Sequence, residues 1–289
     1  MPTRKRNLPC VVVRRGPEVI MLDCGEGTQK QMRYSRIGFN KKMKILISHM
    51  HGDHVLGLPG LFQSMSMLGR TKKIDIYGPK GLKDFIESTE RTVKYSRRFD
   101  LEIYEVNEGR IIEEDEYEIS SKWIDHDFPC LAYALEEKEK PGKFKLNKAK
   151  ELKIPKGPLW KELQKGKSIK IDDITIKPNE VLGPSRPGIK LVYASDTRPC
   201  KPVVVLSKKA DVLIHDCTFE DSHKDKAQDY GHSTASQAAK IAQEAYAKKL
   251  ILIHISAMYE ESNNLLKQAT KIHKSTILAE DLMRIEVRN

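Results

Sequence analysis

The sequence has few cysteines and no paired cysteine motif. Its 289 residues include five cysteines, which are scattered, odd in number and free of any Cys-x-x-Cys pair. This pattern argues against a disulfide scaffold and against a zinc site built from thiolates, and it favours a reducing compartment. We therefore expect a cytoplasmic protein. The cysteines are Cys10, Cys24, Cys130, Cys200 and Cys217.

Long hydrophobic runs are also lacking. No apolar run reaches the ~18–20 residues that cross a bilayer, so we expect no membrane-spanning segment and no membrane partner. The basic segment Met1–Asn7 leads into only a short apolar stretch, which disfavours a signal peptide. Hydrophobic residues are 39% and charged residues 31% of the chain. Because the apolar residues gather in strand-like runs, we expect a packed core rather than disorder.

Acidic residues are outnumbered by basic ones. Lys and Arg total 51 against 40 Asp and Glu, a net charge of +11. The count alone fits general solubility, a lysine-rich organism, or a polyanionic partner drawn to positive charge. Thirteen of the lysines lie in the segment 136–178. This segment is either a solvated surface loop or an inserted arm with a short helix or two, in which Phe144 and Trp160 stack on a base or anchor the arm.

Short apolar strands alternate with helical segments over the rest of the chain. Such alternation is typical of a layered α/β fold. The strands expected to be most buried are Lys44–Ser48, Lys190–Ala194, Val212–His215 and Leu250–His254. The helices expected are Gly57–Leu68, Gly81–Val93, Thr234–Ala247 and Glu260–Ile272.

The strongest chemical signal directly follows one of these strands. The segment Ser48–His54 is Ser-His-Met-His-Gly-Asp-His, with three histidines and one aspartate in six residues. In an extended segment His49 and His51 point to the same side, so both can bind one metal ion. Asp53 and His54 follow a turn and are placed to hold a second ion. Imidazole and carboxylate without thiolate suit Zn²⁺ first, and Mn²⁺ or Fe²⁺ less well.

Further ligands are available elsewhere in the chain. His126, Asp196 and His254 each lie just past an apolar strand, where side chains converge on the open edge of an α/β sandwich. Any one of them alone could be structural. Together they supply the bridging carboxylate and the two imidazoles that a two-metal site lacks.

This His-x-His-x-Asp-His motif with a spaced His, Asp and His resembles the metallo-β-lactamase superfamily. Other segments resemble ribonuclease Z, the endoribonuclease that removes the 3′ trailer from precursor tRNA, in its short form. The matching segments are Pro2–Asn7, Leu22–Gln29, Gly57–Leu61, Tyr77–Gly81 and Gly231–Thr234. The resemblance implies one αββα sandwich over residues 1–289 with the lysine-rich arm 136–178 inserted. It also implies a homodimer that acts on precursor tRNA.

The resemblance further implies roles for individual residues. Two Zn²⁺ ions would carry a bridging hydroxide that attacks phosphorus, leaving a tRNA 3′-hydroxyl and a trailer 5′-phosphate. Asp53 would aid deprotonation of that hydroxide, His232 would polarise the phosphate or protonate the leaving oxygen, and Asp216 would orient His232. Asp23 would brace the metal-binding loop. The ligands would be His49, His51 and His126 for one ion, Asp53, His54 and His254 for the other, and Asp196 for both.

Substrate contacts are implied away from the metal ions. Arg4, Arg6 and Asn7 resemble the segment that contacts the nucleotides around the cleavage point, with a plain basic tail as the alternative. Gly157 and Pro158 match the motif in the family's arm, which contacts the tRNA elbow from the other subunit of the dimer. The remaining histidines match no ligand position, and we expect them to be structural or on the surface: His215, His223 and His273.

Two departures from the family pattern carry expectations of their own. Members usually begin with a strand and a Gly-rich turn before the segment at Pro2, so that first strand is missing here, and we expect Met1 to be an internal methionine of a longer chain. Asp216 stands where the family usually has Glu. Because Asp is one methylene shorter, we expect its contact with His232 to need a backbone shift or a water.

Three other functions compete with this interpretation. A phosphodiesterase of the same fold that acts on small esters would need neither the arm nor the Pro2–Asn7 motif. An mRNA-processing nuclease would carry an inserted domain larger than these ~43 residues. A non-catalytic RNA-binding relative would have lost ligands, yet all seven positions keep theirs.

Overall fold

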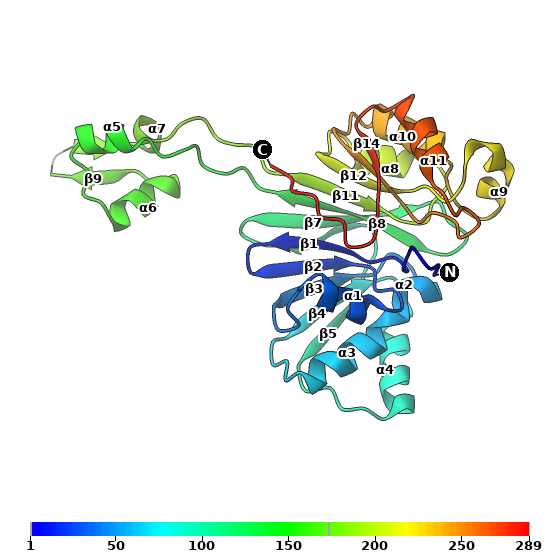
Figure 1. Cartoon of the computed structure of the whole chain (residues 1–289). Helices are drawn as coiled ribbons and strands as arrows, with labels where there is room; N and C mark the ends of the chain where they lie inside the picture. Colours follow the sequence, from blue (N-terminus) through cyan, green and yellow to red (C-terminus); the bar gives the residue numbers. More distant parts are fainter. Residues whose placement is uncertain (1, 173, 289) are drawn as a thin grey trace.

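The computed structural model describes residues 2–172 and 174–288, in which two β-sheets face each other between outer layers of helices (Figure 1). One sheet has five strands in the order β1-β2-β3-β4-β5, and the other has seven in the order β14-β13-β12-β11-β8-β7-β6. A two-stranded sheet, β10-β9, lies in an arm that projects from the sandwich. Each main sheet buries one face against the other, and helices cover the outer faces.

The N-terminal half of the chain forms the five-stranded sheet. A hairpin of two antiparallel strands is followed by three parallel strands. The strands are β1 (Val11–Arg15), β2 (Glu18–Leu22), β3 (Lys42–Leu46), β4 (Ile74–Gly78) and β5 (Leu101–Glu105). The helices of this half are α1 (Thr28–Tyr34), the single turn α2 (Gly52–Val55), α3 (Gly57–Met67) and α4 (Leu82–Val93).

The seven-stranded sheet changes direction at its centre. In chain order, the first three strands, β6 to β8, pair antiparallel, and the last four, β11 to β14, run parallel to one another. The strands are β6 (Gly109–Glu113), β7 (Tyr117–Ile124), β8 (Cys130–Glu137), β11 (Lys190–Ala194), β12 (Val212–Asp216), β13 (Leu250–Ile253) and β14 (Thr276–Leu278). The helices of this half are α8 (Lys201–Leu206), η1 (Asp221–His223), α9 (Lys224–Asp229), α10 (Ala235–Glu244) and α11 (Asn263–Thr270).

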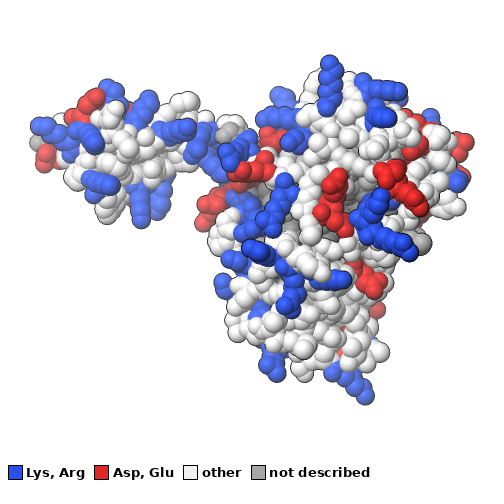
Figure 2. Space-filling view, in the orientation of Figure 1, with Lys and Arg blue, Asp and Glu red and all other residues white. Residues whose placement is uncertain are grey.

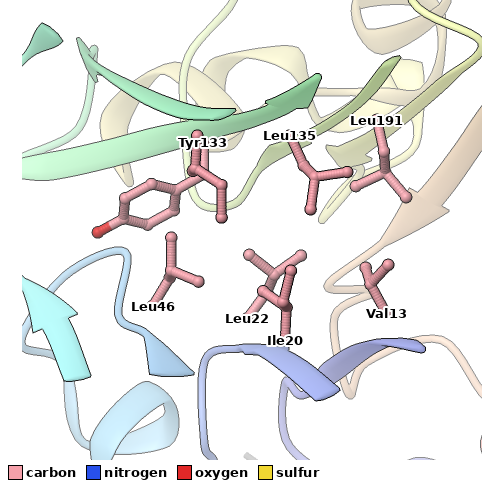
Figure 3. A pocket seen from close by; sticks show the side chains of 8 residues that line it. Val13, Ile20, Leu22, Leu46, Tyr133, Leu135 and Leu191 are labelled. Carbon is pink, nitrogen blue, oxygen red and sulfur yellow. The ribbon is translucent and has the colours of Figure 1, made fainter. Parts of the chain in front are cut away.

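The layer between the two sheets is almost completely filled. Aliphatic and tyrosine side chains from both sheets interdigitate there. The cavity drawn in Figure 3 measures only about 10 Å³ and is lined by apolar groups, so it has room for no ligand. Its lining residues are Val13, Ile20, Leu22, Leu46, Ile119, Tyr133, Leu135 and Leu191.

One lysine is buried where the two sheets meet. Lys44 of β3 is 3% exposed, and its ammonium group lies 2.9 Å from Glu18 and 2.6 Å from Glu114. Burial alone would raise the pKa of Glu18, but hydrogen bonds and charge from Lys44 and Lys42 outweigh it and lower that pKa. The pKa of Glu114 is lowered mainly by its hydrogen bond from Lys44. The three groups therefore form an ionised network that links β3 to both sheets.

The arm leaves the sandwich after β8 and returns at β11. It contains α5 (Leu146–Glu151), α6 (Pro158–Gln164), β9 (Ile169–Ile171), β10 (Ile174–Ile176) and α7 (Pro178–Val181). Backbone bridges between Lys140 and Arg186 pair its outgoing and returning chains. The projection therefore occupies residues 138–189, whereas lysine density suggested 136–178. The returning segment has Arg186 as its one basic residue, so composition did not mark it.

The two aromatic residues of the arm face its interior. The rings of Phe144 and Trp160 lie 4.9 Å apart, and Trp160 Nε1 donates a hydrogen bond to the Ile154 carbonyl. They pack against a small apolar cluster, which includes Ala149, Ile154, Leu163, Ile169, Ile176 and Val181. Of the two roles left open for these aromatics, the structure favours anchoring the arm over stacking on a base.

Most strands and long helices lie within a few residues of their predicted positions, but one central strand was missed. The strand β8 contains four residues of high helix propensity, two Leu and two Ala, in Leu-Ala-Tyr-Ala-Leu, and six of its eight residues are buried. A strand buried on both faces shows no alternation of polar and apolar residues. None of the described helices is long and apolar enough to cross a membrane.

Candidate metal centre

The metal centre lies at one edge of the sandwich, where strands from both sheets end. The loop after β3 carries the histidine motif, and β7 is followed by His126. Later in the chain, β11 is followed by Asp196 and β13 by His254. Parallel strands bring their carboxyl ends to the same edge, so residues more than 200 positions apart meet there.

The first group of side chains combines three histidines with one aspartate. Ligand atoms of His49, His51, His126 and Asp196 all lie within 4.8 Å of one another. His49 Nε2 is 2.9 Å from His51 Nδ1, and His126 Nε2 is 3.4 Å from the same atom. His49 and Asp196 are buried, and the other two are half-buried. The site thus faces solvent on one side only.

The second group combines an aspartate with two histidines. Ligand atoms of Asp53, His54 and His254 also lie within 4.8 Å of one another. His254 Nε2 is 3.3 Å from Asp53 Oδ2, and His54 Nε2 is 3.5 Å from it. Asp196 stands between the groups, with its carboxylate oxygens 3.5 Å from His54 Nε2, 3.4 Å from His254 Nε2 and 3.7 Å from His49 Nε2. The structure thus brings the seven predicted ligands together, and a third group of possible ligands adds His232 to Asp196 and His254.

Hydrogen bonds on the far side of four rings orient the histidines. In each ring Nδ1 has an acceptor outside the cluster, so Nε2 keeps its lone pair and faces inward. The acceptors are Ser48 Oγ for His49 (2.9 Å), Asp23 Oδ2 for His54 (2.7 Å), the Gly231 carbonyl for His126 (2.9 Å) and Thr218 Oγ1 for His254 (2.9 Å).

The polar atoms of this cluster fit a bound cation. His54 Nε2 is buried and has no hydrogen-bond partner among the described residues. Burial lowers the pKa of His49 to about 3, which keeps its ring neutral and available as a ligand. Burial opposes ionisation of Asp53, yet His254 and His54 outweigh it and hold its pKa far below the ordinary value. Neutral imidazole beside ionised carboxylate is the donor set that divalent zinc takes.

Two protein families match parts of the chain. Residues 5–125 match the family described as anti-Pycsar protein Apyc1. Residues 146–255 match the beta-lactamase superfamily domain. The second match covers the arm and the strands that carry Asp196 and His254.

Curated relatives match along the whole chain. Ribonuclease Z of Nitrosopumilus maritimus (strain SCM1) is 42% identical over 287 residues, which cover 99% of this chain and 96% of the relative. Ribonuclease Z of Methanothermobacter thermautotrophicus is 41% identical over 288 residues, covering 100% of this chain and 94% of the relative. The chain belongs to the ribonuclease Z family.

Solved structures agree with this assignment. The crystal structure of human tRNase Z, short form, has a TM-score of 0.72 and 26% identity, and the match covers 100% of this chain and 95% of that one. A long form RNase Z from yeast, at 18% identity, shares the fold with a TM-score of 0.60 over 98% of this chain and 39% of that chain. The predicted metallo-β-lactamase sandwich and the predicted ribonuclease Z family are both confirmed.

A further histidine lies beside the ligands of this ribonuclease Z. The ring of His232 stacks on that of His254, with 5.1 Å between their centroids. Its Nδ1 lies 3.1 Å from Asp216 Oδ2. This contact is direct, so it needs no bridging water, which was one of the two means expected for the shorter aspartate. Burial lowers the pKa of His232, but the Asp216 carboxylate and two further aspartates outweigh it and raise that pKa to about 9.

One glycine makes this arrangement possible. Gly231 has a φ of +74°, and a Cβ built there would lie 2.4 Å from His126 Nδ1. The same residue supplies the carbonyl that accepts the hydrogen bond from that nitrogen. Any larger residue would therefore push against a ligand and lose a conformation that glycine adopts freely.

Two of the three predicted substrate-binding residues in the N-terminal segment bond to other parts of the protein. Arg6 Nη2 donates to the carbonyls of Ser256 and Tyr259, in the loop after His254. The Asn7 side chain and backbone both donate to Asp281 in the C-terminal segment. Arg4 is exposed. The structure therefore leaves Arg4 free for substrate, while Arg6 and Asn7 fasten the segment in place.

The remaining predicted residues lie away from the cluster. Gly157 caps the N-terminus of α6 in the arm, and Pro158 is its first residue. The three unassigned histidines fall outside the groups of possible ligands in the described ranges and bond to nearby atoms. Their partners are the Asp216 carbonyl for His215, the Tyr259 hydroxyl for His223, and the Ala247 carbonyl and Thr276 hydroxyl for His273.

Sequence reasoning missed two residues beside the site. Arg198 binds Asp125 at 3.2 Å and Asp127 at 2.7 Å, which fixes the loop on both sides of His126. Phe128 is 56% exposed and packs edge-on against the His51 ring, with 4.6 Å between centroids. An exposed aromatic residue two positions after a ligand was the available signal for Phe128. Nothing in the sequence indicated the partners of Arg198.

Proposed function

We propose that this chain removes the 3′ trailer from precursor tRNA by metal-dependent hydrolysis at the site centred on Asp196. As a ribonuclease Z, the chain is an endoribonuclease of tRNA 3′-end processing. One observation carries the assignment of the reaction to this site. The buried Asp196 belongs to one group of possible ligands and lies within 3.5 Å of His54 Nε2 and His254 Nε2 in the other, and His54 Nε2 has no hydrogen-bond partner within the described residues.

The site is suited to two divalent cations, with Zn²⁺ first and Mn²⁺ or Fe²⁺ as alternatives. One ion would take the His49, His51 and His126 rings, the other would take Asp53, His54 and His254, and Asp196 would bridge them. When bound, two such ions activate water at neutral pH and neutralise charge on the phosphate.

Asp53 is placed to receive the proton of the attacking water. Its side chain is 28% exposed, compared with 3% for Asp196, so its carboxylate is the one that an entering water can reach. It is ionised because His254 and His54 hold its pKa below the ordinary range. The water oxygen bonds to phosphorus as one of its protons passes to this carboxylate.

His232 is placed to protonate the leaving oxygen. Its Nδ1 faces Asp216, which leaves Nε2 for the substrate, and the Asp216 carboxylate raises the pKa of the ring and so favours its protonated form. As the bond from phosphorus to the 3′ oxygen breaks, that oxygen takes the proton of His232. The products are a tRNA 3′-hydroxyl and a trailer 5′-phosphate.

The arm is proposed to bind the tRNA backbone. Residues 138–189 contain fourteen Lys and Arg against six Asp and Glu, which accounts for most of the chain's net charge of +11. Figure 2 shows blue side chains outnumbering red ones on the visible face of the arm. Clustered lysines bind phosphates without regard to sequence and release counterions. The arm thus supplies affinity for any precursor tRNA.

The arm and the metal centre lie at opposite ends of the same strands. The strand β8 begins four residues after His126 and ends where the arm begins (Figure 1). Its eight residues separate the two regions by about 26 Å. This placement supports a homodimer in which the arm of one subunit serves the site of the other.

An apolar surface is available for such a dimer. Large hydrophobic side chains on α1 and α3, two helices that pack together, and on the residues that flank α3 point into solvent. The residues are Tyr34, Leu56, Met67 and Leu68, and Met67 is 84% exposed. We assign a second copy of this chain as the occupant, because the arm needs a partner's site. Light scattering should give a dimer that Met67→Glu dissociates and the exposed arm substitution Lys161→Glu does not.

Two exposed side chains, Phe128 and Arg4, are proposed to contact the nucleotides at the cut. Phe128 offers an aromatic face next to His51, where a base flanking the bound phosphate can stack. Arg4 offers an exposed cation for which the described residues show no ion pair. The five free cysteines fit the expected cytoplasmic location, where thiols persist.

The test is cleavage of a 5′-labelled precursor tRNA that carries a 3′ trailer. We expect one cut next to the discriminator nucleotide, which needs Zn²⁺ or Mn²⁺ and is abolished by chelator and by Asp53→Ala. The matched control Asp229→Ala removes an exposed carboxylate on α9 and should cleave as wild type.

A different outcome would select a competing function. Turnover of a small phosphodiester without any cut in precursor tRNA would favour the general phosphodiesterase. Tight tRNA binding by a protein that takes up no metal would favour the non-catalytic RNA-binding relative.

A further inference from the structure

A buried tyrosine connects the two sheets directly beneath the metal centre. Tyr193 of β11 lies in the apolar layer between the sheets and is 0% exposed. Its hydroxyl oxygen is 2.7 Å from Oδ2 of Asp23, which follows β2 in the opposite sheet. The same carboxylate oxygen accepts a 2.7 Å hydrogen bond from His54 Nδ1. The Asp23 carboxylate therefore links Tyr193 of the seven-stranded sheet to His54, which follows a strand of the five-stranded sheet.

The hydroxyl protons in this region can be assigned. Ser195 Oγ lies 3.4 Å from the Tyr193 hydroxyl and 3.0 Å from Asp196 Oδ1. Each hydroxyl has one proton to donate, and carboxylates are the strongest acceptors present. Tyr193 therefore donates to Asp23, and Ser195 donates to Asp196. The Tyr193 hydroxyl therefore lies between Asp23, which orients His54, and Ser195, which bonds to Asp196.

Asp23 depends on its donors to keep its position. Its φ of +59° lies in the left-handed region, which non-glycine residues seldom adopt. Besides Tyr193 and His54, it accepts hydrogen bonds from the backbone and hydroxyl of Ser48 at 2.7 and 2.8 Å. Of these donors, Tyr193 alone comes from the seven-stranded sheet. It is the one that ties Asp23 to the packing of the sandwich.

We propose that Tyr193 is a positioning residue for the cation held by Asp53, His54 and His254. Its hydroxyl holds the Asp23 carboxylate in the orientation that aims His54 Nε2 into the cluster. In the other group His126 takes its support from Gly231, and His49 reaches Asp23 only through the Ser48 hydroxyl, so the largest effect of Tyr193 falls on the ion beside His54. This inference rests on the proposed function only in that the site binds divalent cations.

A matched pair of substitutions tests the role. Tyr133 lies in the same apolar layer, is 1% exposed, and donates its hydroxyl to the Ile47 carbonyl at 2.6 Å. Tyr193→Phe and Tyr133→Phe each remove one buried hydroxyl, but only the first removes a donor to Asp23. Zn²⁺ binding to the metal-free full-length proteins would be measured by titration calorimetry and by competition with a chelator.

We expect Tyr193→Phe to weaken one of two Zn²⁺ sites about 10- to 100-fold, as loss of such outer contacts does elsewhere. Tyr133→Phe should bind both ions close to wild type. Equal losses in the two variants would reduce the effect to general loosening of the core and overturn the inference. Wild-type affinity in Tyr193→Phe would overturn it as well.

A double-mutant cycle shows whether Tyr193 acts through Asp23. Asp23→Asn should weaken the same site, and adding Tyr193→Phe should then change little, because the two groups act as one unit. Additive losses would contradict the pathway. A wild type that binds two ions but cuts no precursor tRNA would refute the proposed function and leave this comparison intact. A wild type that binds no metal would refute both.

Discussion

The metal centre and the arm are built in opposite ways. The centre gathers buried and half-buried side chains from the loops after β3, β7, β11 and β13, and hydrogen bonds from residues around them orient four of its histidine rings. The arm is a continuous segment, 138–189, with local contacts, a small apolar cluster of its own and lysines that face solvent. One region depends on the packing of the whole sandwich, and the other depends mainly on itself.

This difference shows how charge is used in the two regions. In the centre a single misplaced atom alters the coordination of an ion, so each side chain is held by a second one. In the arm, exposed pairs such as Lys148 with Glu151 contribute little, and affinity for a polyanion is the sum of many similar contacts. We therefore expect single substitutions to be severe in the centre and mild in the arm.

The largest effect is expected for Asp196→Ala. Loss of the bridging carboxylate removes a ligand from both groups, so cleavage of precursor tRNA should fall by more than about 10³-fold. Single-turnover cleavage and metal content would be measured together. Full metal content with a rate within tenfold of wild type would show that Asp196 is not shared.

His232→Ala should affect the reaction but not the ions. We expect kcat to fall by about 10²- to 10⁴-fold with little change in KM, because the leaving oxygen loses its proton donor. Metal content should stay at the wild-type level. His223→Ala, which changes a histidine outside the cluster, serves as the control, and an equal loss in that variant would count against the assignment.

Buried and exposed charge can be compared through stability. Lys44→Met should lower the free energy of unfolding by about 3–5 kcal/mol, because Glu18 is left buried without its main partner. Lys148→Ala should leave it almost unchanged, because the ion pair of this lysine with Glu151 is exposed to solvent. Urea unfolding of both variants tests the contrast between sandwich and arm, and similar values would contradict it.

The same lysine network predicts a pH dependence. The pKa of Glu18 and that of Glu114 are lowered in the folded state, so their contribution is complete above the ordinary glutamate pKa of about 4.3. It is lost as the pH falls through the folded values. Between neutral pH and pH ~3, wild type should therefore lose more stability than Lys44→Met. If the free energy of unfolding fell equally with pH in the two proteins, the network would not be a source of the loss of stability in acid.

Arm lysines should act additively on tRNA affinity. The triple variant of Lys153, Lys156 and Lys161 to Ala should raise KM and flatten the slope of log affinity against log salt by up to about 3. The turnover of a small phosphodiester should not change. A triple variant of Lys208, Lys271 and Lys274, exposed on the sandwich, is the matched control and should leave the slope unaltered.

The smallest effect is expected at the edge of the centre. Phe128→Ala should raise KM for precursor tRNA about tenfold through loss of base stacking, and Phe128→Leu should raise it less. Metal content should be unchanged in both. Val205→Ala shortens another exposed apolar side chain, on α8, and should have no effect.

Much of the fold was predictable because local patterns agree with it. The strand and helix periods of the sequence placed most elements, and the motif at Ser48–His54 marked the metal site. The missed strand β8 is buried on both faces and rich in Leu and Ala, so no alternation revealed it. The C-terminal boundary of the arm was predicted at residue 178 and not 189, because residues 179–189 have the composition of an ordinary surface loop.

The sequence by itself determined the ligand types, the basic arm and the family. Only the tertiary structure decided which side chains support the ligands. Tyr193, Arg198 and Phe128 carry no motif, and their roles exist because two sheets pack face to face and bring their hydroxyl, guanidinium and ring within contact of the site. Such contacts join positions up to 170 residues apart, and short-range patterns in a chain hold no information about distances of that kind.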